Sequence, residues 1–300
     1  MAAVKTVAVI GAGIMGRGIA HVAALGGYRT ILEDILPASL RKAESEIRAN
    51  LDKGVELGKL EKSAADAAFS RIQLVGSVEE AAREADLVIE AVPEEMDSKI
   101  EIFTLLDKIC RPGTILASNT SSLSVTEIAS VTYRPRKCVG MHFFNPVHKM
   151  KLLEVVRALE TDDETIAAAT EVGQRMGKEV VVIKESPGFI TSRINAMIGN
   201  EAFYMLQEGI ASAEDIDKAL KLGLNHPMGP FELVDLVGLD TRLHILEYLH
   251  KSLGEKFRPA PLLVQHVKAG RLGRKTGRGV FDYPDAQSSQ EKAAESKLVH

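Results

Sequence analysis

The sequence predicts an α/β domain that carries a helical insertion and is followed by a smaller all-α domain. Two observations lead to this fold class. Short apolar segments alternate with helical patterns in the first part of the chain, whereas beyond residue 185 helical spacing of apolar residues dominates. We therefore expect domains at residues 1–185 and 186–284, with residues 285–300 as a frayed polar tail.

Five short segments of the first domain, rich in valine and isoleucine, are typical of buried strands. They are Val4–Ile10, Thr30–Glu33, Leu87–Ala91, Thr114–Ala117 and Cys138–Met141. Because amphipathic or charged stretches separate them, they predict a parallel sheet with helices on both faces. Residues 37–70 form a charged, helix-prone insertion that mixes acids and bases, which favours a solvated pair of helices over a ligand-binding arm.

The second domain begins where strand patterns give way to helix signals. Ser186 suits an N-cap and Pro187 the first helical position. Ser212, with Asp215 three residues later, resembles a capping box. The apolar spacing predicts helices that end at Gly209, Gly223 and Gly254, the third beginning near Asp240, and a short strand at Gly279–Tyr283.

A glycine-rich turn follows the first predicted strand. Gly11, Gly13 and Gly16 form a G-x-G-x-x-G pattern, with Met15 inside it, between a strand and a helix. In dinucleotide-binding turns these glycines permit the tight turn, the close approach of a pyrophosphate and the packing of helix on strand. The helix N-terminus offers free N–H groups to the phosphates. The pattern therefore predicts a Rossmann-type domain.

The end of the second predicted strand indicates which dinucleotide is bound. Glu33 and Asp34 end this strand, and Asp34 lies eighteen residues after Gly16, where a carboxylate meets the adenine ribose. Asp34 can accept hydrogen bonds from a 2′-hydroxyl but would repel a 2′-phosphate. The next arginine is as far away as Arg41. These features favour NAD over NADP.

An imidazole and a carboxylate lie twelve residues apart in the segment His142–Glu154. His142 follows a predicted strand, at the edge where open α/β sheets bind ligands. Oxidation of an alcohol with NAD requires a base, and histidine is the usual choice because its ordinary pKa lies near neutrality. Glu154 could orient the ring and stabilise the imidazolium. The other seven histidines are candidates on composition alone, so the residue types leave this assignment open.

Two further polar groups follow predicted strands at the same edge. Asn119 and Ser121 belong to the polar segment 118–122 and could hold a substrate oxygen or the nicotinamide. A polar turn that caps the helix beginning near Val125 is the alternative. Glu94 and Lys99 could likewise reach a ligand or form an ordinary surface pair.

Composition excludes several classes of partner. The net charge of −4 argues against nucleic acid or an anionic membrane as the main partner. Cys110 and Cys138 lie in apolar contexts without metal-type spacing, so we expect free thiols and no metal site. No apolar run approaches the ~18 residues of a membrane span. The N-terminus runs directly into a strand and leaves no room for a signal peptide, so we expect a cytoplasmic protein.

Several motifs together resemble the L-3-hydroxyacyl-CoA dehydrogenase family. Besides the glycine pattern they are Ala-Ser-Asn-Thr-Ser-Ser-Leu (117–123), His-Phe-Phe-Asn-Pro (142–146), Met-Lys-Leu-Leu-Glu (150–154), Ser-Pro-Gly-Phe (186–189) and Pro-Met-Gly-Pro-Phe-Glu-Leu (227–233). The resemblance covers residues 4 to 283. It implies NAD-dependent interconversion of short-chain 3-hydroxyacyl-CoA and 3-oxoacyl-CoA, and a homodimer formed through the helical domain.

The resemblance also implies roles for particular residues. His142 would be the catalytic base, Glu154 its partner, and Ser121 a contact of both the substrate oxygen and the cofactor. Contacts with NAD are implied for Asp34, Glu94, Lys99, Asn145 and Lys275. Contacts with coenzyme A are implied for Asn50 and Lys53.

The sequence departs from the family pattern at one position. Many relatives carry asparagine in the helix after Pro-Gly-Phe, where it helps to hold the substrate carbonyl, and this chain has Ser192 there, with Asn195 one turn later. Two other functions compete: a dehydrogenase of free hydroxy or sugar acids, and an NAD-binding module without turnover. The first group replaces the Phe-Phe of 143–144, and the second would have no reason to keep Ser121, His142 and Glu154.

Overall fold

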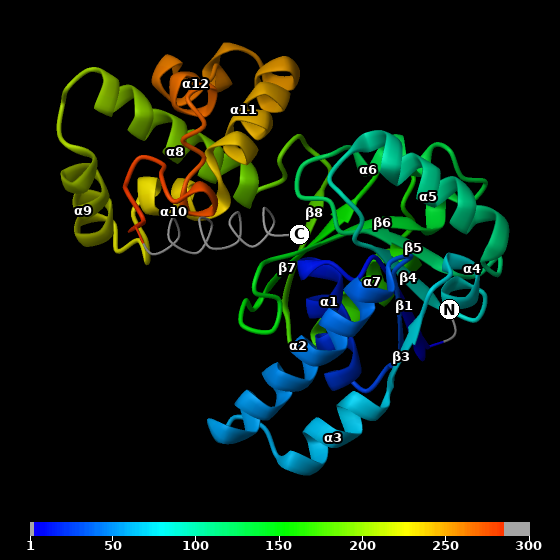
Figure 1. Ribbon diagram of the computed structural model, residues 1–300. Helices are drawn as coiled ribbons and strands as arrows, with labels where there is room; N and C mark the ends of the chain where they lie inside the picture. Colours follow the sequence, from blue (N-terminus) through cyan, green and yellow to red (C-terminus); the bar gives the residue numbers. More distant parts are fainter. Residues whose placement is uncertain (1–2, 285–300) are drawn as a thin grey trace, which may run out of the picture. The chain divides into compact units, whose positions relative to one another are not determined.

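The computed structural model describes residues 3–284. It divides into two compact units, Met1–Phe189 and Ile190–His300 (Figure 1). The tail expected to be frayed, 285–300, lies outside the described residues. Across residues 3–284, every helix is too short or too polar to cross a membrane.

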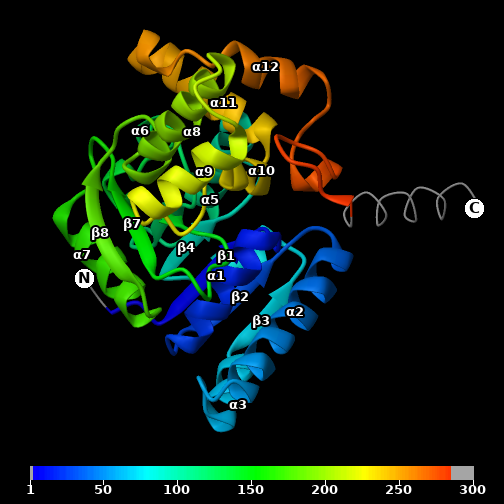
Figure 2. The same cartoon turned by 90° about the vertical axis from the view of Figure 1, so that its left-hand side faces the viewer.

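The first unit is built on one eight-stranded sheet. In spatial order its strands are β3 (Ile72–Val75), β2 (Arg29–Glu33), β1 (Thr6–Ile10), β4 (Leu87–Glu90), β5 (Ile115–Ser118), β6 (Cys138–Phe143), β7 (Leu152–Arg157) and β8 (Glu179–Lys184). The edge strands β3 and β8 lie far apart in Figure 2. The strand order reverses direction along the chain after β3, which is the arrangement of a dinucleotide-binding sheet.

Helices cover both faces of this sheet, as the sequence predicts. They are α1 (Ile14–Leu25), α2 (Pro37–Glu56), α3 (Lys62–Ser70), α4 (Val78–Ala82), α5 (Met96–Ile109), α6 (Val125–Ala129), the 3₁₀ turn η1 (Pro135–Lys137) and α7 (Asp163–Arg175). Alternate residues of β1 enter different cores: Val7 and Val9 join α1, α2, α3 and α7, whereas Ala8 and Ile10 join α4, α5 and α6. The alternation follows from the two-residue period of a strand.

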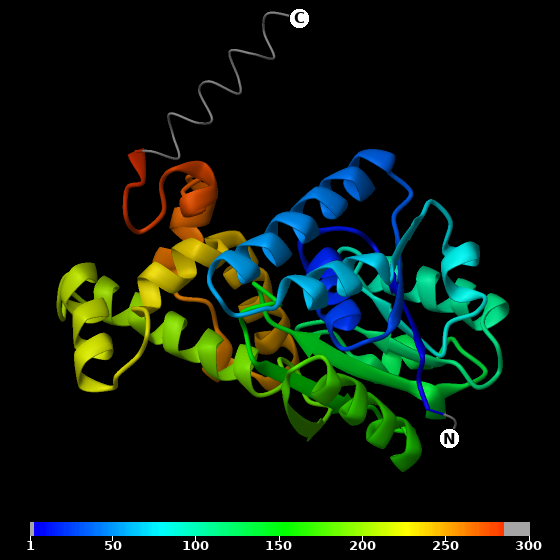
Figure 3. The ribbon, with the colours of Figure 1, turned by 90° about the horizontal axis from the view of Figure 1, so that it is seen from below.

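The charged insertion forms the two predicted helices, α2 and α3, which lie side by side (Figure 3). Their apolar residues Ala43, Ile47 and Leu51 join the core that includes α1. Their exposed charges pair along the helices, for example Lys62 with Asp66 one turn later.

Three strands, β3, β7 and β8, are absent from the sequence prediction. β8 is an edge strand whose residues are exposed or half-buried, although its sequence contains the apolar run Val180–Ile183. β7 pairs antiparallel with β6, whereas the other neighbouring strands pair parallel. The prediction of a purely parallel sheet is therefore wrong at this edge, and the antiparallel pair carries the candidate site.

The second unit is helical in its described part. Its elements are α8 (Thr191–Gln207), α9 (Ala213–Gly223), α10 (Pro230–Val237), α11 (Leu239–Leu253), η2 (Glu255–Phe257), α12 (Pro261–Lys268) and η3 (Arg274–Thr276). Their core includes Phe203 and Phe231, whose rings meet edge to face at 5.2 Å. Ser212 caps α9 by accepting a hydrogen bond from the Asp215 amide, as predicted.

Two local predictions for this region are wrong. The first helix begins at Thr191 rather than Pro187, because Gly188 and Phe189 have positive φ angles that an α-helix excludes. Gly279–Tyr283 is not a strand within the described residues. Its amides at Val280 and Phe281 donate instead to the buried carboxylate of Asp235.

Candidate active site

The glycine pattern forms the turn between β1 and α1. Gly11 has φ +97°, and a Cβ at Gly16 would lie 1.7 Å from the Gly11 carbonyl oxygen, so neither position tolerates a side chain. A Cβ at Gly13 would meet nothing within 4 Å. Gly13 therefore faces open space at the start of α1, where the first-turn amides can receive a pyrophosphate. This geometry fits a dinucleotide.

Two carboxylates lie at the end of β2 beside this turn: Glu33 is the last residue of the strand and Asp34 follows it. Asp34 accepts hydrogen bonds from the amides of Ala12 (2.9 Å) and Leu36 (2.8 Å), one on each oxygen. A carboxylate has further lone pairs, so Asp34 can still accept hydrogen bonds from a ribose hydroxyl. Burial, and then the neighbouring Asp34 carboxylate, raise the pKa of Glu33 to about 7.

His142 and Glu154 form a buried pair across the antiparallel strands β6 and β7. They are direct partners in the strand register, and Nδ1 of His142 lies 2.7 Å from Oε2 of Glu154. His142 is 6% exposed and Glu154 1%. In sequence the residue types alone leave this pairing open; in the structure Glu154 follows the connection after β6 and lies within β7. A cross-strand pair fixes both side chains more firmly than a loop would.

Aromatic rings hold the imidazole of His142. The ring centroid of Phe144 lies 4.3 Å from that of His142, and the Phe189 centroid lies 5.8 Å away. Phe143, the other phenylalanine of the motif, is 2% exposed and belongs to the core of the sheet. Phe189 has a positive φ angle and lies five residues beyond the end of β8.

The polar loop after β5 is tied to the strand that carries His142. Asn119 Oδ1 accepts a hydrogen bond from the Phe143 amide at 3.0 Å, next to His142 in the chain. Ser121, two residues beyond Asn119, is half-buried. The loop also caps α6, but through Ser124, which accepts from the Glu127 amide. The Asn119 bond therefore brings the loop of Ser121 beside the end of β6.

Glu94 and Lys99 do not form an ordinary surface pair. Lys99 is 1% exposed, and its Nζ lies 2.8 Å from Glu90 and 3.2 Å from Glu94. Glu94 in turn accepts from the amide and the hydroxyl of Ser121 at 2.7 and 3.1 Å. The structure therefore connects Glu94 to Ser121, whereas the ammonium group of Lys99 is enclosed between two carboxylates.

The remaining predicted residues lie on several other segments of the chain. Met15 is half-buried in α1, and Asn145 is exposed in the connection after β6. Asn50 and Lys53 are exposed on α2, where Lys53 pairs with Glu56. Ser192 lies in the first turn of α8 in the second unit, where Lys275 also lies, with its Nζ 2.6 Å from Asp240.

Two residues that shape this site are missing from the sequence prediction: Glu90 and Phe189. The available signal for Glu90 is an acid at the end of an otherwise apolar strand, because a buried carboxylate needs partners. Ser118 supplies one such partner, at 2.6 Å. Phe189 follows the glycine of Ser-Pro-Gly-Phe, but its contact with His142 has no local signal.

Two basic residues, Lys178 and His21, contact the connection between β6 and β7. Nζ of Lys178 donates to the carbonyl oxygens of Val147 and Met150, the latter at 2.8 Å. His21, buried in α1, stacks on His148 with ring centroids 5.5 Å apart. Burial first, and then His148 and Lys178, lower the pKa of His21 to about 4.

This buried histidine predicts a loss of stability in acid. His21 has an ordinary pKa of 6.5 when unfolded, so its contribution is fully present above that pH and is lost as the pH falls towards 4. Between about pH 7 and pH 5, urea unfolding should lose about 2 kcal/mol through this group. The His21→Leu variant should lack that part of the pH dependence, whereas His244→Gln, at an exposed histidine of α11, should match the unmodified protein. Equal pH dependence of the His21→Leu variant and the unmodified protein would contradict the assignment.

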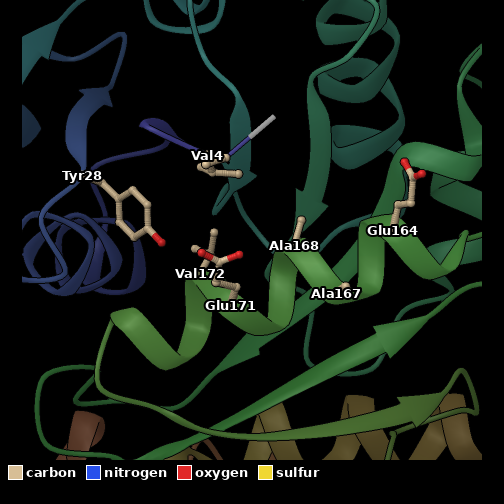
Figure 4. Close-up of a pocket in the computed structure, with 8 residues that line it drawn as sticks. Val4, Tyr28, Glu164, Ala167, Ala168, Glu171 and Val172 are labelled. Atoms are coloured by element: carbon tan, nitrogen blue, oxygen red, sulfur yellow. The ribbon is translucent and has the colours of Figure 1, made fainter. Parts of the chain in front are cut away.

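A separate cavity lies at the N-terminal ends of β1 and β2, whereas the glycine turn and Asp34 lie at their C-terminal ends. It has a volume of about 210 Å³ and is lined by Val4, before β1, by Tyr28, before β2, and by residues of α7 that include Glu171 (Figure 4). The glycine turn and Asp34 follow these same two strands, so the cavity is not part of the site. Within residues 3–284, no cluster of three or more His, Cys, Asp or Glu side chains could hold a metal ion.

Two family models match nearly the whole chain. The model described as the 3-hydroxyacyl-CoA dehydrogenase NAD binding domain matches residues 6–186. The model of the 3-hydroxyacyl-CoA dehydrogenase C-terminal domain matches residues 188–283. The matches therefore include the glycine turn, the His142–Glu154 pair and the helical unit.

Curated relatives and solved structures agree with these models. A probable 3-hydroxybutyryl-CoA dehydrogenase of Bacillus subtilis is 47% identical over 286 residues, 95% of this chain and 99% of the relative. The 3-hydroxybutyryl-CoA dehydrogenase of Bradyrhizobium diazoefficiens is 46% identical over 287 residues, 95% of this chain and 98% of the relative. The crystal structure of (S)-3-hydroxybutyryl-CoA dehydrogenase from Ralstonia eutropha has a TM-score of 0.91 and 43% identity, and the match covers 94% of this chain and 99% of that one.

Proposed function

Because the chain belongs to the 3-hydroxyacyl-CoA dehydrogenase family and binds NAD, we propose that it interconverts (S)-3-hydroxybutyryl-CoA and acetoacetyl-CoA with His142 as acid and base. The observation that carries the proposal is the buried cross-strand pair of His142 and Glu154, 2.7 Å apart. A buried imidazole held by a carboxylate is suited to proton transfer at a defined atom.

His142 acts through Nε2, because Nδ1 is engaged by Glu154. When Nδ1–H donates to Glu154, Nε2 carries the lone pair that accepts the proton of the 3-hydroxyl group. Glu154 then stabilises the imidazolium, and in the reverse direction the imidazolium returns the proton to the carbonyl oxygen. NAD, when bound, accepts the hydride that leaves the carbinol carbon.

The other site residues bind and orient the cofactor and the substrate. The glycine turn and the N-terminus of α1 receive the pyrophosphate, and Asp34 binds the adenine ribose. Ser121 contacts the substrate oxygen and the cofactor. We assign further cofactor contacts to Met15, Glu94, Lys99, Asn119, Asn145 and Lys275. Substrate contacts are assigned to Asn50, Lys53 and Ser192.

The protein works as a homodimer in the cytoplasm. The helical unit supplies the dimer contact, and its exposed apolar side chains support this assignment. They include Ile210, Leu222 and Leu224, which are 64%, 77% and 66% exposed. Large exposed apolar groups of this kind are typical of surfaces that bind another protein.

The substrate class is tested by comparing acyl-CoA thioesters with free acids. We expect NADH-dependent reduction to be fastest with the four-carbon acetoacetyl-CoA, to decline towards sixteen-carbon chains, and to be negligible with free acetoacetate. The rate series uses the fall in NADH absorbance. Faster turnover of the free acid than of its thioester would support the alternative dehydrogenase of hydroxy or sugar acids.

A further inference from the structure

A chain of charged side chains, Glu90, Lys99 and Glu94, connects the end of β4 to Ser121. It begins at Glu90, the last residue of β4, which is fully buried. Oε1 of Glu90 accepts from the Val92 amide and from Lys99 Nζ, both at 2.8 Å, and Oε2 accepts from the Ser118 hydroxyl at 2.6 Å. With both oxygens engaged, Glu90 has one defined orientation.

Lys99 extends this chain towards the surface. Its ammonium group, 3.2 Å from Glu94, joins the buried Glu90 to a carboxylate that is 39% exposed. A buried ammonium group is tolerated only where opposite charges compensate it, and here two carboxylates do so. Lys99 therefore fixes the position of the Glu94 carboxylate through one ion pair, and Glu90 fixes the position of Lys99 through another.

Glu94 transmits this arrangement to the loop after β5. Its Oε1 accepts three hydrogen bonds, from the Thr120 hydroxyl (2.7 Å), the Ser121 amide (2.7 Å) and the Ser121 hydroxyl (3.1 Å). Burial raises the pKa of Glu94, but the Lys99 charge and these hydrogen bonds outweigh it and hold the pKa below its ordinary value. Glu94 is thus an anionic acceptor that fixes both the backbone and the hydroxyl of Ser121.

We infer that Glu90 is a positioning residue of the reaction, acting through Lys99 and Glu94 on Ser121. The inference rests on the proposed function, in which Ser121 contacts the substrate. Glu90 is fully buried and is not assigned a contact with substrate or cofactor. Its effect on turnover therefore depends on the presence of the Ser121 hydroxyl, which distinguishes it from a residue that only stabilises the fold.

The test is a double-mutant cycle of Glu90→Gln and Ser121→Ala, measured with acetoacetyl-CoA and NADH. Glutamine keeps the size of the side chain but removes the charge that holds Lys99. We expect Glu90→Gln to lower kcat at least tenfold. In the Ser121→Ala background the same substitution should lower kcat less than twofold, because interacting residues are non-additive.

A matched control is the half-buried ion pair of Asp107 and Arg134, 2.7 Å apart in the same unit. Asp107→Asn should lower the thermal unfolding midpoint, as Glu90→Gln does, but leave kcat unchanged. If Glu90→Gln fails to fold, Ser118→Ala removes only one hydrogen bond to Glu90 and should give a smaller loss of kcat that is again absent in the Ser121→Ala background.

Two results would overturn the inference. One is a folded Glu90→Gln or Ser118→Ala variant with the kcat of the unmodified protein. The other is that Glu90→Gln lowers kcat by the same factor in the Ser121→Ala background as in the unmodified protein. Failure of the proposed function looks different, because the unmodified protein itself would then not oxidise NADH with acetoacetyl-CoA.

Discussion

The His142→Gln variant is expected to lose about 10² to 10⁴-fold in kcat, the range contributed by a positioned general base. The glutamine amide can still donate to Glu154, so the buried carboxylate keeps a hydrogen-bond partner. It has no basic nitrogen to accept the hydroxyl proton. Steady-state rates with acetoacetyl-CoA measure the loss, and NADH fluorescence measures binding, which should change little because His142 is outside the nucleotide turn.

A control in the same segment separates chemistry from loop structure. His148 is an exposed histidine of the connection between β6 and β7, and His148→Gln should keep at least half of the kcat of the unmodified protein. Parallel loss of turnover, NADH binding and thermal stability in His142→Gln would mean that His142 is a structural histidine and not the base.

The second large effect concerns two glycines of the nucleotide turn. Gly16→Ala would place a Cβ 1.7 Å from a backbone oxygen, so the turn or α1 must shift, and we expect a loss of about 3 kcal/mol in unfolding free energy. Gly13→Ala should leave stability unchanged, because nothing lies within 4 Å of the new Cβ. It should instead weaken NADH binding tenfold or more, because the methyl group enters the space assigned to the pyrophosphate.

Chemical denaturation and NADH titration of both variants form a complete comparison. Each variant is the control of the other, since both add one methyl group to the same turn. Tight NADH binding by Gly13→Ala would contradict the placement of the pyrophosphate beside Gly13. A fully stable Gly16→Ala protein would contradict the described packing of α1 on β1.

Much of the first unit could be predicted because its signals are local. The glycine turn, the buried strands and the charged helical pair each leave a pattern within a few neighbouring residues. The apolar run Val180–Ile183 of β8 is also a local pattern, but it does not reveal that β8 is an exposed edge strand paired with β7. Pro187 predicts a helix start, but the positive φ angles at Gly188 and Phe189 delay the start of α8 to Thr191.

The candidate site likewise has features that the sequence predicts and features that only the fold reveals. The types and order of His142, Glu154 and Ser121 could be recognised in the sequence, but the cross-strand register that joins the first two could not. Lys99 looks like a surface residue in sequence because its burial depends on Glu90, which is nine positions away in the chain and in a different element. Long-range burial of a charged group is a property of the fold and not of the local pattern.

The central claim is that this chain uses NADH to reduce an acyl-CoA thioester at the site of His142 and Glu154. It is tested most directly by adding acetoacetyl-CoA to the purified protein and NADH and following NADH absorbance. We expect a saturable decrease in absorbance, proportional to protein concentration and lost in the His142→Gln variant. Binding of NADH without any oxidation on addition of acetoacetyl-CoA would contradict it.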